Sequence, residues 1–259
     1  MISIFLKDRE GQLLARADHE AEAFLCADRL YEDGDYFEVE GARHLWIQAD
    51  VAIPAGEAYL PDGRMTWKVP RGEHLLAYAP TAFTGSRHIF SAREMTDAEI
   101  RGLRCLSRNP SDLRGNTDFY PHCTANVETR NESCFAARNA IDGVLLNTFH
   151  GEWPYQSWGI GTRTDACLTL DLGRTVCVER AALVLRADFP HDAYWVSGEL
   201  RMDDGCVVSF PLQRTGERQW IDLGGKHLIR TVQLTNLIKS DDPSAFPALT
   251  QLELYGKDV

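Results

Sequence analysis

Aromatic rings and charged side chains lie together in one stretch of the chain, residues 136–159. Trp153 and Tyr155 are two positions apart, and His150 and Glu152 come just before them. A Gly and a Pro interrupt the stretch and its apolar residues do not alternate, so it favours neither a long helix nor a strand, and we predict a loop. Such rings stack on the C–H faces of sugars while polar side chains bind the hydroxyls, so the loop indicates saccharide recognition.

The predicted sugar-binding side chains come from this loop and from other polar turns. Trp153 and Tyr155 would stack on the sugar, and the further candidates are Arg130, Arg138, Asn139, Arg186, Asp192 and Trp195. A guanidinium binds a carboxylate bidentately, so the arginines also allow a uronic acid. The alternative is structural: Trp153 and Trp158 would plug the end of a β-sandwich, and the arginines would neutralise nearby acids.

A second set of side chains is suited to proton transfer. The candidates are His122, His150, Glu152, Asp188 and His191. Neighbouring carboxylates and imidazoles push each other's pKa values apart, which general acid and base roles require. The same residues are common in turns, and a single histidine is more often structural. The sequence contains no nucleophile elbow, phosphate-binding loop, zinc-protease motif or dinucleotide fingerprint beside them.

Charge and cysteine content restrict the partners. The 259-residue chain has a formal net charge of −11 and no Lys/Arg-rich run, which disfavours nucleic acid and anionic membranes and favours neutral small molecules, a saccharide among them. No segment approaches the roughly 18 apolar residues of a membrane span, and no signal peptide is evident. The seven cysteines form an odd set without a CxxC pair and are predicted to be reduced, so a cytoplasmic location is expected.

The elements that must position these side chains are mainly strands. The pattern predicts strands over residues 2–6 and 12–16, and a helix over 18–31 from apolar residues at helical spacing. From residue 36 onward, short β-rich runs follow each other at intervals of about ten residues, which is typical of a sandwich or jelly roll. A capping box at 96–99 predicts one short helix.

A loop-rich stretch divides the chain. Residues 108–120 are rich in Asn, Pro, Asp and Gly and form the best boundary, after which alternating strands return. We therefore predict an all-β protein of two β-sandwich (jelly-roll) domains with a few short helices. The N-terminal domain covers residues 1–110 and the C-terminal domain residues 111–259.

The C-terminal half also carries spaced motifs. These are NAIDG (139–143), Trp158, LTLDLG (168–173) and LTQLELYG (249–256). In this order and spacing, residues 117–257 resemble a discoidin domain, also called a coagulation factor 5/8 type C domain. This family belongs to the galactose-binding-like superfamily and is close to the family-32 carbohydrate-binding modules.

The resemblance implies a jelly roll with ligand-binding loops at one end. Four segments would then meet there: residues 120–132, 137–159, 186–195 and 240–250. It also implies a structural calcium ion held partly by the aspartate of the DG motif and partly by a late acidic residue. Here Asp142 matches the first ligand, but Gln251 stands where an acid is usual. The prediction is therefore no cofactor, or a structural calcium ion at Asp142 and Gln251.

Three functions remain open from the sequence. The first is a carbohydrate-binding protein that recognises a neutral or mildly acidic saccharide through the loops of the C-terminal barrel. The second is a cytosolic carbohydrate-active enzyme, namely a lyase, an isomerase or a glycosidase. A lyase would set Arg138 or Arg186 against a uronate, and a glycosidase would pair Glu152 with Asp188 or Asp192. The third is a protein-interaction role, and the acidic charge disfavours anionic lipid as its target.

Overall fold

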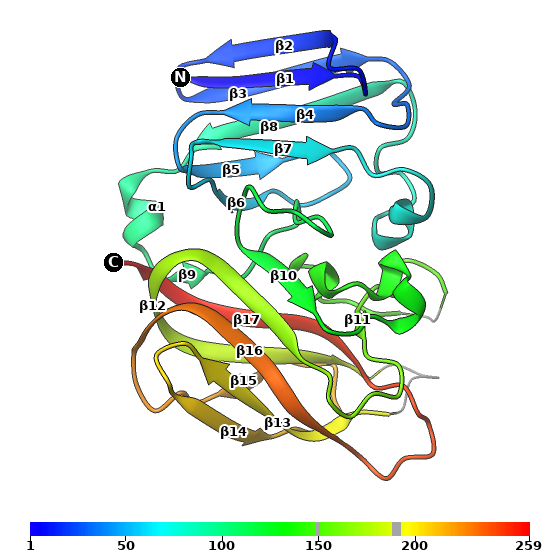
Figure 1. Cartoon of the computed structure of the whole chain (residues 1–259), viewed down its shortest axis with the longest axis vertical. Coiled ribbons are helices and arrows are strands. Elements are labelled where there is room, and N and C mark those ends of the chain that lie inside the picture. Colours follow the sequence, from blue (N-terminus) through cyan, green and yellow to red (C-terminus); the bar gives the residue numbers. More distant parts are fainter. Residues whose placement is uncertain (149–150, 188–192) are drawn as a thin grey trace.

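The computed structural model describes residues 1–148, 151–187 and 193–259. Strands predominate in these ranges, and the one α-helix that they contain has five residues. Figure 1 shows two β units stacked along the long axis of the molecule, with the start of the chain in the upper unit and α1, β9 and β10 between the two. The all-β prediction with a few short helices is confirmed.

The first unit, the N-terminal sandwich, consists of two four-stranded antiparallel sheets. Their strand orders are β2-β1-β4-β7 and β3-β8-β5-β6. The strands are β1 (Ile2–Lys7), β2 (Leu13–His19), β3 (Glu22–Asp28), β4 (Tyr36–Glu40), β5 (His44–Gln48), β6 (Gly56–Tyr59), β7 (Arg64–Lys68) and β8 (Arg87–Glu94). Alternate residues are buried in β3 and β7, so each of these strands directs one face into the core between the sheets.

The predicted helix over residues 18–31 is wrong. Strands β2 and β3 occupy most of this region, joined by a short turn. Ala23, Leu25 and Ala27 are buried at every second position, whereas Phe24, which fitted the helical spacing, is 61% exposed. The buried residues therefore follow the period of two that is typical of a strand, and the helical spacing of some apolar residues is incidental.

The second unit, the C-terminal sandwich, is a nine-stranded sheet that folds over on itself. Its main path is β11-β17-β12-β16-β13-β14, while β10 and β15 pair with β12, and β9 pairs with β17. The strands are β9 (Arg104–Cys105), β10 (His122–Ala125), β11 (Trp158–Gly159), β12 (Leu168–Arg186), β13 (Trp195–Met202), β14 (Val207–Pro211), β15 (Gln219–Ile221), β16 (His227–Lys239) and β17 (Ala248–Asp258). Because β12 is 19 residues long and pairs with four other strands, it links the two layers of this sandwich.

Short helical turns lie between the units. They are η1 (Gly72–Ala77), α1 (Asp97–Arg101), η2 (Thr129–Asn131), η3 (Ser133–Phe135) and η4 (Ala137–Ile141). The predicted capping box begins α1 as expected: the Thr96 side chain accepts from the Glu99 N–H, and the Glu99 carboxylate accepts from the Thr96 N–H.

Each unit has its own hydrophobic core. In the N-terminal sandwich, Phe37 and Phe90 stack with ring centroids 4.3 Å apart beside the buried Trp67. In the C-terminal sandwich, Trp158 and Trp195 lie in a second cluster of buried residues. The predicted boundary segment is itself packed, because Asn109, Ser111 and Asp112 are buried in it.

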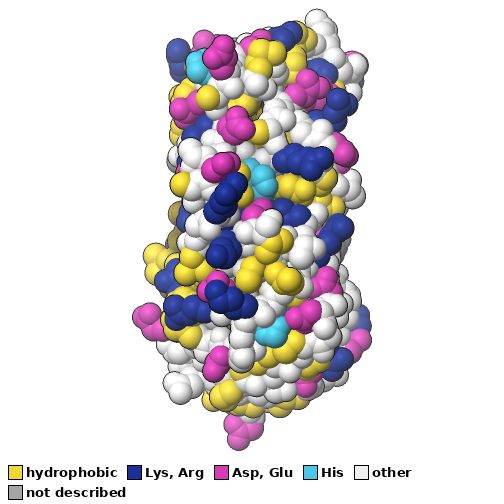
Figure 2. Space-filling model, turned by 90° about the vertical axis from the view of Figure 1, so that its left-hand side faces the viewer, with side chains coloured by type: hydrophobic (Ala, Val, Ile, Leu, Met, Phe, Trp, Pro, Cys, Tyr) yellow, Lys and Arg dark blue, Asp and Glu magenta, His cyan; other side chains and the backbone are white. Residues whose placement is uncertain are grey.

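Buried charges join the two units on the face that carries α1 and the C-terminus. Glu57 of β6 receives hydrogen bonds from Arg104 at 2.7 and 2.9 Å and from Arg174 at 2.6 Å. Asp258 of β17 accepts from the same two arginines at 2.6 to 2.9 Å. Figure 2 shows Lys and Arg side chains gathered around the middle of this face. Four charges from both units therefore form one network at the junction, which we call the junction ion network.

Two further predictions concern cysteines and membrane segments. All seven cysteines are free, as expected from their number and spacing. Among the described residues, no helix combines the length and the apolar character that crossing a membrane requires.

Candidate functional site

The aromatic loop of the C-terminal sandwich is partly open to solvent. Trp153 is 36% exposed, and Tyr155 is half-buried with its ring edge against Phe135 at a centroid distance of 6.3 Å. The guanidinium of Arg186 lies 5.8 Å from the Tyr155 ring centroid and is buried. The structure thus brings together two predicted residues, Tyr155 and Arg186, while Trp153 lies two positions before Tyr155 on the same loop. The cavity next to Trp153 measures only about 20 Å³, too small for a sugar ring.

The two tryptophans next along the chain are core residues. Trp158 and Trp195 are 0% exposed, and their ring centroids are 6.3 Å apart. The indole of Trp158 donates to the Val127 carbonyl at 2.9 Å. The structural alternative therefore holds for Trp158, and the ligand-binding role predicted for Trp195 is wrong because its side chain is sealed in the hydrophobic interior.

Asn139 is also structural. Its side chain is 0% exposed and donates to the carbonyls of Ser133 at 2.8 Å and Ser157 at 3.3 Å. These bonds connect the helical turns to the start of β11, so the structure contradicts the prediction that Asn139 binds ligand. Arg130 forms a bidentate ion pair with Glu132 at 2.6 Å, as its structural alternative predicted.

His122 is held by a buried carboxylate. Its Nδ1 lies 2.7 Å from the Asp112 Oδ1, and Asp112 also accepts from the Cys123 N–H at 3.0 Å. Burial disfavours the charged ring, but the hydrogen bond to Asp112 and the negative charges of Asp112 and Asp171 together outweigh burial and raise the pKa of His122. This arrangement orients His122 at the start of β10, where it joins the boundary segment to the C-terminal sandwich.

The structure shows no cluster of the other predicted catalytic residues within the ranges that it describes. His150, Asp188, His191 and Asp192 lie outside the described residues. Glu152 is exposed on the aromatic loop. The carboxylate pair and the imidazole cluster that an enzyme would need therefore remain predictions.

Asp142 and Gln251 meet as the resemblance implies, but with an amide where a cation would be. The Gln251 Nε2 lies 2.7 Å from the Asp142 Oδ1, 2.8 Å from the Asn139 carbonyl oxygen and 2.6 Å from the Thr250 carbonyl oxygen. The Gly143 N–H donates to the Gln251 Oε1 at 3.0 Å, and this fixes which end of the amide faces the oxygens. Gly143 has a φ of 82°, a conformation that glycine adopts without strain.

These residues do not fit a calcium ion. A hard cation requires six to eight oxygens, several of them anionic, whereas the oxygens here surround an N–H₂ group and include a single carboxylate. No cluster of three or more His, Cys, Asp and Glu suited to a metal occurs among the described residues either. The amide of Gln251 satisfies the oxygens that a cation would otherwise bind.

Asp142 should make the stability of the fold depend on pH. Burial raises the pKa of Asp142 to about 6, against the opposing effects of Arg138 and of hydrogen bonds from Val144, Gln156 and Gln251. A carboxyl group with a raised pKa stabilises the fold below its unfolded value near 4 and loses that contribution as the pH rises through 6. Between pH ~4 and ~7 we therefore expect the unfolding free energy of wild type to fall by up to about 3 kcal/mol relative to that of Asp142→Asn, whose amide does not titrate.

Urea denaturation at several pH values measures this difference. A constant difference between the two proteins across that range would show that Asp142 is ionised at the same pH in the folded and unfolded chains.

A larger hollow lies where the two units meet, on the side away from the junction ion network. Its volume is about 550 Å³, which is within the range of small-molecule sites. Its apolar wall includes Tyr36, Val69, Tyr78, Leu113 and Ala136. We call this hollow the junction pocket.

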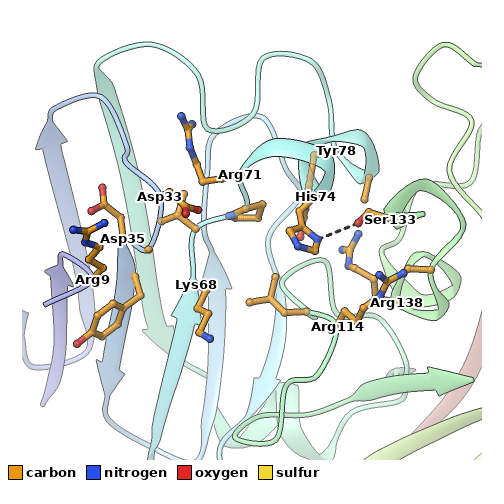
Figure 3. Close-up of a pocket in the computed structure, with 17 residues that line it drawn as sticks. Arg9, Asp33, Asp35, Lys68, Arg71, His74, Tyr78, Arg114, Ser133 and Arg138 are labelled. Atoms are coloured by element: carbon orange, nitrogen blue, oxygen red, sulfur yellow. Dashed lines mark hydrogen bonds between the residues drawn. The ribbon is translucent and has the colours of Figure 1, made fainter. Parts of the chain in front are cut away.

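The polar side chains of the junction pocket come from both units. Figure 3 shows Arg9, Asp33 and Asp35 at one end, and His74, Arg114, Ser133 and Arg138 at the other, where the N-terminal sandwich meets η3 and η4. His74 Nδ1 lies 3.0 Å from Ser133 Oγ. The Ser133 hydroxyl also donates to Glu73 at 2.6 Å, so this cluster is a set of hydrogen bonds across the junction.

The lining of the junction pocket is cationic although the chain is acidic. Five Arg and Lys side chains line it against two carboxylates. Arg9 and Arg114 are paired with Glu10 and Glu128. Lys68 and Arg71, which flank Val69 and Pro70, have no ion-pair partner among the described residues.

Comparisons with known proteins concern the fold. No family model and no curated protein matches the chain. Similar solved structures include the chitosan-binding module 1 of a chitosanase/glucanase from Paenibacillus sp. IK-5, at 18% identity over 59% of this chain and 99% of the module, with a TM-score of 0.40. The family 32 CBM of C. perfringens NanJ in complex with galactose matches at 16% identity over 51% of this chain and 91% of the module, with a TM-score of 0.40.

A lectin domain belongs to the same group of neighbours. The lectin domain of Lectinolysin, complexed with Lewis B antigen, matches at 14% identity over 60% of this chain and 97% of that domain, with a TM-score of 0.43. These neighbours include the class of module that the motifs of the C-terminal half resemble. At this level of likeness their ligands say nothing about the ligand of this chain.

Proposed function

We propose that this protein binds a saccharide and that the junction pocket holds it. The observation that carries the proposal is the combination of volume and lining: about 550 Å³ with an apolar wall that includes two tyrosines and with charged hydrogen-bonding groups from both units. Sugar rings need this combination, because their C–H faces pack on apolar surface while their hydroxyls require polar partners. Hydrogen-bond donors at the pocket come from Lys68 and Arg71, which have no ion-pair partner among the described residues, and from the exposed imidazole of His74.

The location differs from the loop site expected from the sequence. Three residues connect the two places, because Ser133, Ala136 and Arg138 line the junction pocket and lie in or between η3 and η4, which come shortly before Trp153 in the chain. The partly exposed Trp153 keeps the aromatic loop as a rival site for the same function.

Calorimetry against a panel of mono- and oligosaccharides tests the proposal. We expect Tyr36→Ala to weaken binding at least about tenfold, because it removes an aromatic wall of the pocket. Trp153→Ala is the matched control, since it removes a partly exposed ring from the aromatic loop, and it should leave the affinity unchanged. The opposite pattern would place the sugar on the aromatic loop, and the absence of binding across the panel would contradict the function itself.

A further inference from the structure

Arg138 is a buried cation in the wall of the junction pocket. Its side chain donates to three neutral oxygens: Nε to the Asp112 carbonyl at 2.7 Å, Nη2 to the Pro110 carbonyl at 2.8 Å, and Nη1 to the Asn139 Oδ1 at 3.0 Å. Arg138 is only 5% exposed. It forms no ion pair with any described carboxylate, so its charge is removed from water without an anion in contact with it. Burying a charge in this way is unfavourable unless an anion approaches.

The guanidinium of Arg138 still has N–H groups that can donate to a ligand. A guanidinium has five N–H donors, and the three hydrogen bonds above leave two of them available. The carbonyls of Pro110 and Asp112 hold the group in one position, and the Tyr78 ring lies 4.8 Å from the guanidinium carbon. A preorganised fork of this kind binds an anion with little further loss of side-chain entropy.

Tyr78 adds a second observation at the same end of the pocket. It is 6% exposed, and its hydroxyl has no hydrogen-bond partner in the described part of the chain. Buried hydroxyls are normally paired, so a ligand acceptor at this position would satisfy the group. His74 and Arg114 lie at this end as well, and both are exposed (Figure 3).

We infer that this end of the junction pocket binds the carboxylate of an acidic sugar, such as a uronic acid residue. The inference rests on the proposed function and specifies its ligand. A carboxylate beside Arg138 and Tyr78 accepts from the remaining guanidinium N–H groups and from the tyrosine hydroxyl, while the apolar wall packs against the sugar ring. The local cations overcome the net charge of −11, which disfavours anions only at longer range.

Matched pairs of sugars test the inference. Glucuronate and galacturonate are compared by calorimetry with glucose and galactose, and with the methyl esters of both acids. We expect the acids to bind at least about tenfold more tightly than their neutral forms. Glucose 6-phosphate distinguishes a carboxylate site from a phosphate site, and tighter binding of the phosphate ester would overturn the assignment to a carboxylate.

Three variants identify the groups responsible. Tyr78→Phe removes an unpaired hydroxyl, so it should fold as well as wild type and bind the acids several-fold more weakly. Arg138→Gln and Arg114→Gln should reduce the preference for acids over neutral sugars. The matched control is Arg163→Gln, which removes an exposed, ion-paired arginine outside the pocket and should change nothing.

Each outcome separates this inference from the proposed function. Equal binding of acids and neutral sugars, still weakened by Tyr36→Ala, would overturn the inference and leave the function in place. A preference for acids that survives in Tyr78→Phe, Arg138→Gln and Arg114→Gln would place the anion elsewhere and also overturn it. Absence of binding by every sugar would overturn both.

Discussion

Replacement of Glu57 by Gln is expected to destabilise the protein by about 3–5 kcal/mol. Glu57 is 3% exposed and accepts hydrogen bonds from Arg104 and Arg174 across the junction. Of the carboxylates that the structure describes, the neutral amide leaves only Asp258 as a partner of the two buried guanidinium groups. Chemical denaturation measures the loss, and a separate early transition would show that the two units come apart first.

Glu132→Gln is the matched control for this substitution. It removes the same charge from an ion pair with Arg130 that is largely exposed, so its cost should remain below about 1 kcal/mol. Similar costs for both variants would contradict a special role for the junction ion network.

The same network predicts acid sensitivity. Burial opposes ionisation of Glu57, but Arg104, His44 and Arg174 outweigh it and lower the pKa of Glu57 to about 2. A carboxyl group with a lowered pKa stabilises the fold above its unfolded value and loses that contribution as the pH falls toward 2. Between pH ~5 and ~2, the unfolding free energy of wild type should therefore fall by up to about 3 kcal/mol relative to that of Glu57→Gln.

Gln251→Glu is expected to make the stability of the protein depend on calcium. The new carboxylate lies beside Asp142 at the position where the amide now donates at 2.7 Å, and two carboxylates so close repel each other. Without metal we expect a loss of about 2–4 kcal/mol at neutral pH. The surrounding carbonyls of Asn139 and Thr250 then complete an oxygen site, so saturating calcium should restore at least about 2.7 kcal/mol.

Thermal unfolding with and without calcium chloride measures this effect. Wild type should not respond, because its amide already satisfies the oxygens. Gln156→Glu is the matched control: it also brings a carboxylate next to Asp142, where the Gln156 amide now donates at 3.3 Å, but it does not face the two carbonyls. Calcium stabilisation of wild type, or of Gln156→Glu alone, would contradict this account of Gln251.

The strand pattern predicted much of the fold. Alternation and turn spacing indicated an all-β chain, and the capping box at Thr96 and Glu99 located α1. The failure at residues 18–31 arose because Ala21, Phe24 and Leu25 fit a helical period by chance. Sheet pairing of β2 with β1 and of β3 with β8 uses the period of two instead.

The junction pocket could not be predicted in the same way. Its lining comes from segments between Arg9 and Arg138, and only the packing of two units brings them together. One local signal was present, because Lys68, Arg71 and His74 fall within seven residues of an acidic chain. Arg138 was among the residues predicted from the sequence, but residue type alone could not separate its buried guanidinium, which has no ion pair within the described part of the chain, from that of Arg130, which is neutralised by Glu132.

The order of the strands along the chain has a consequence for synthesis on the ribosome. All eight strands of the N-terminal sandwich have been made by Glu94, whereas β17, which pairs with β9, β11 and β12, is the last strand of the sequence. The first unit can therefore fold while translation continues, but the second cannot close until β17 has left the exit tunnel. The turn η4, which carries Arg138, packs against β17, so the junction pocket is complete only after that strand is in place.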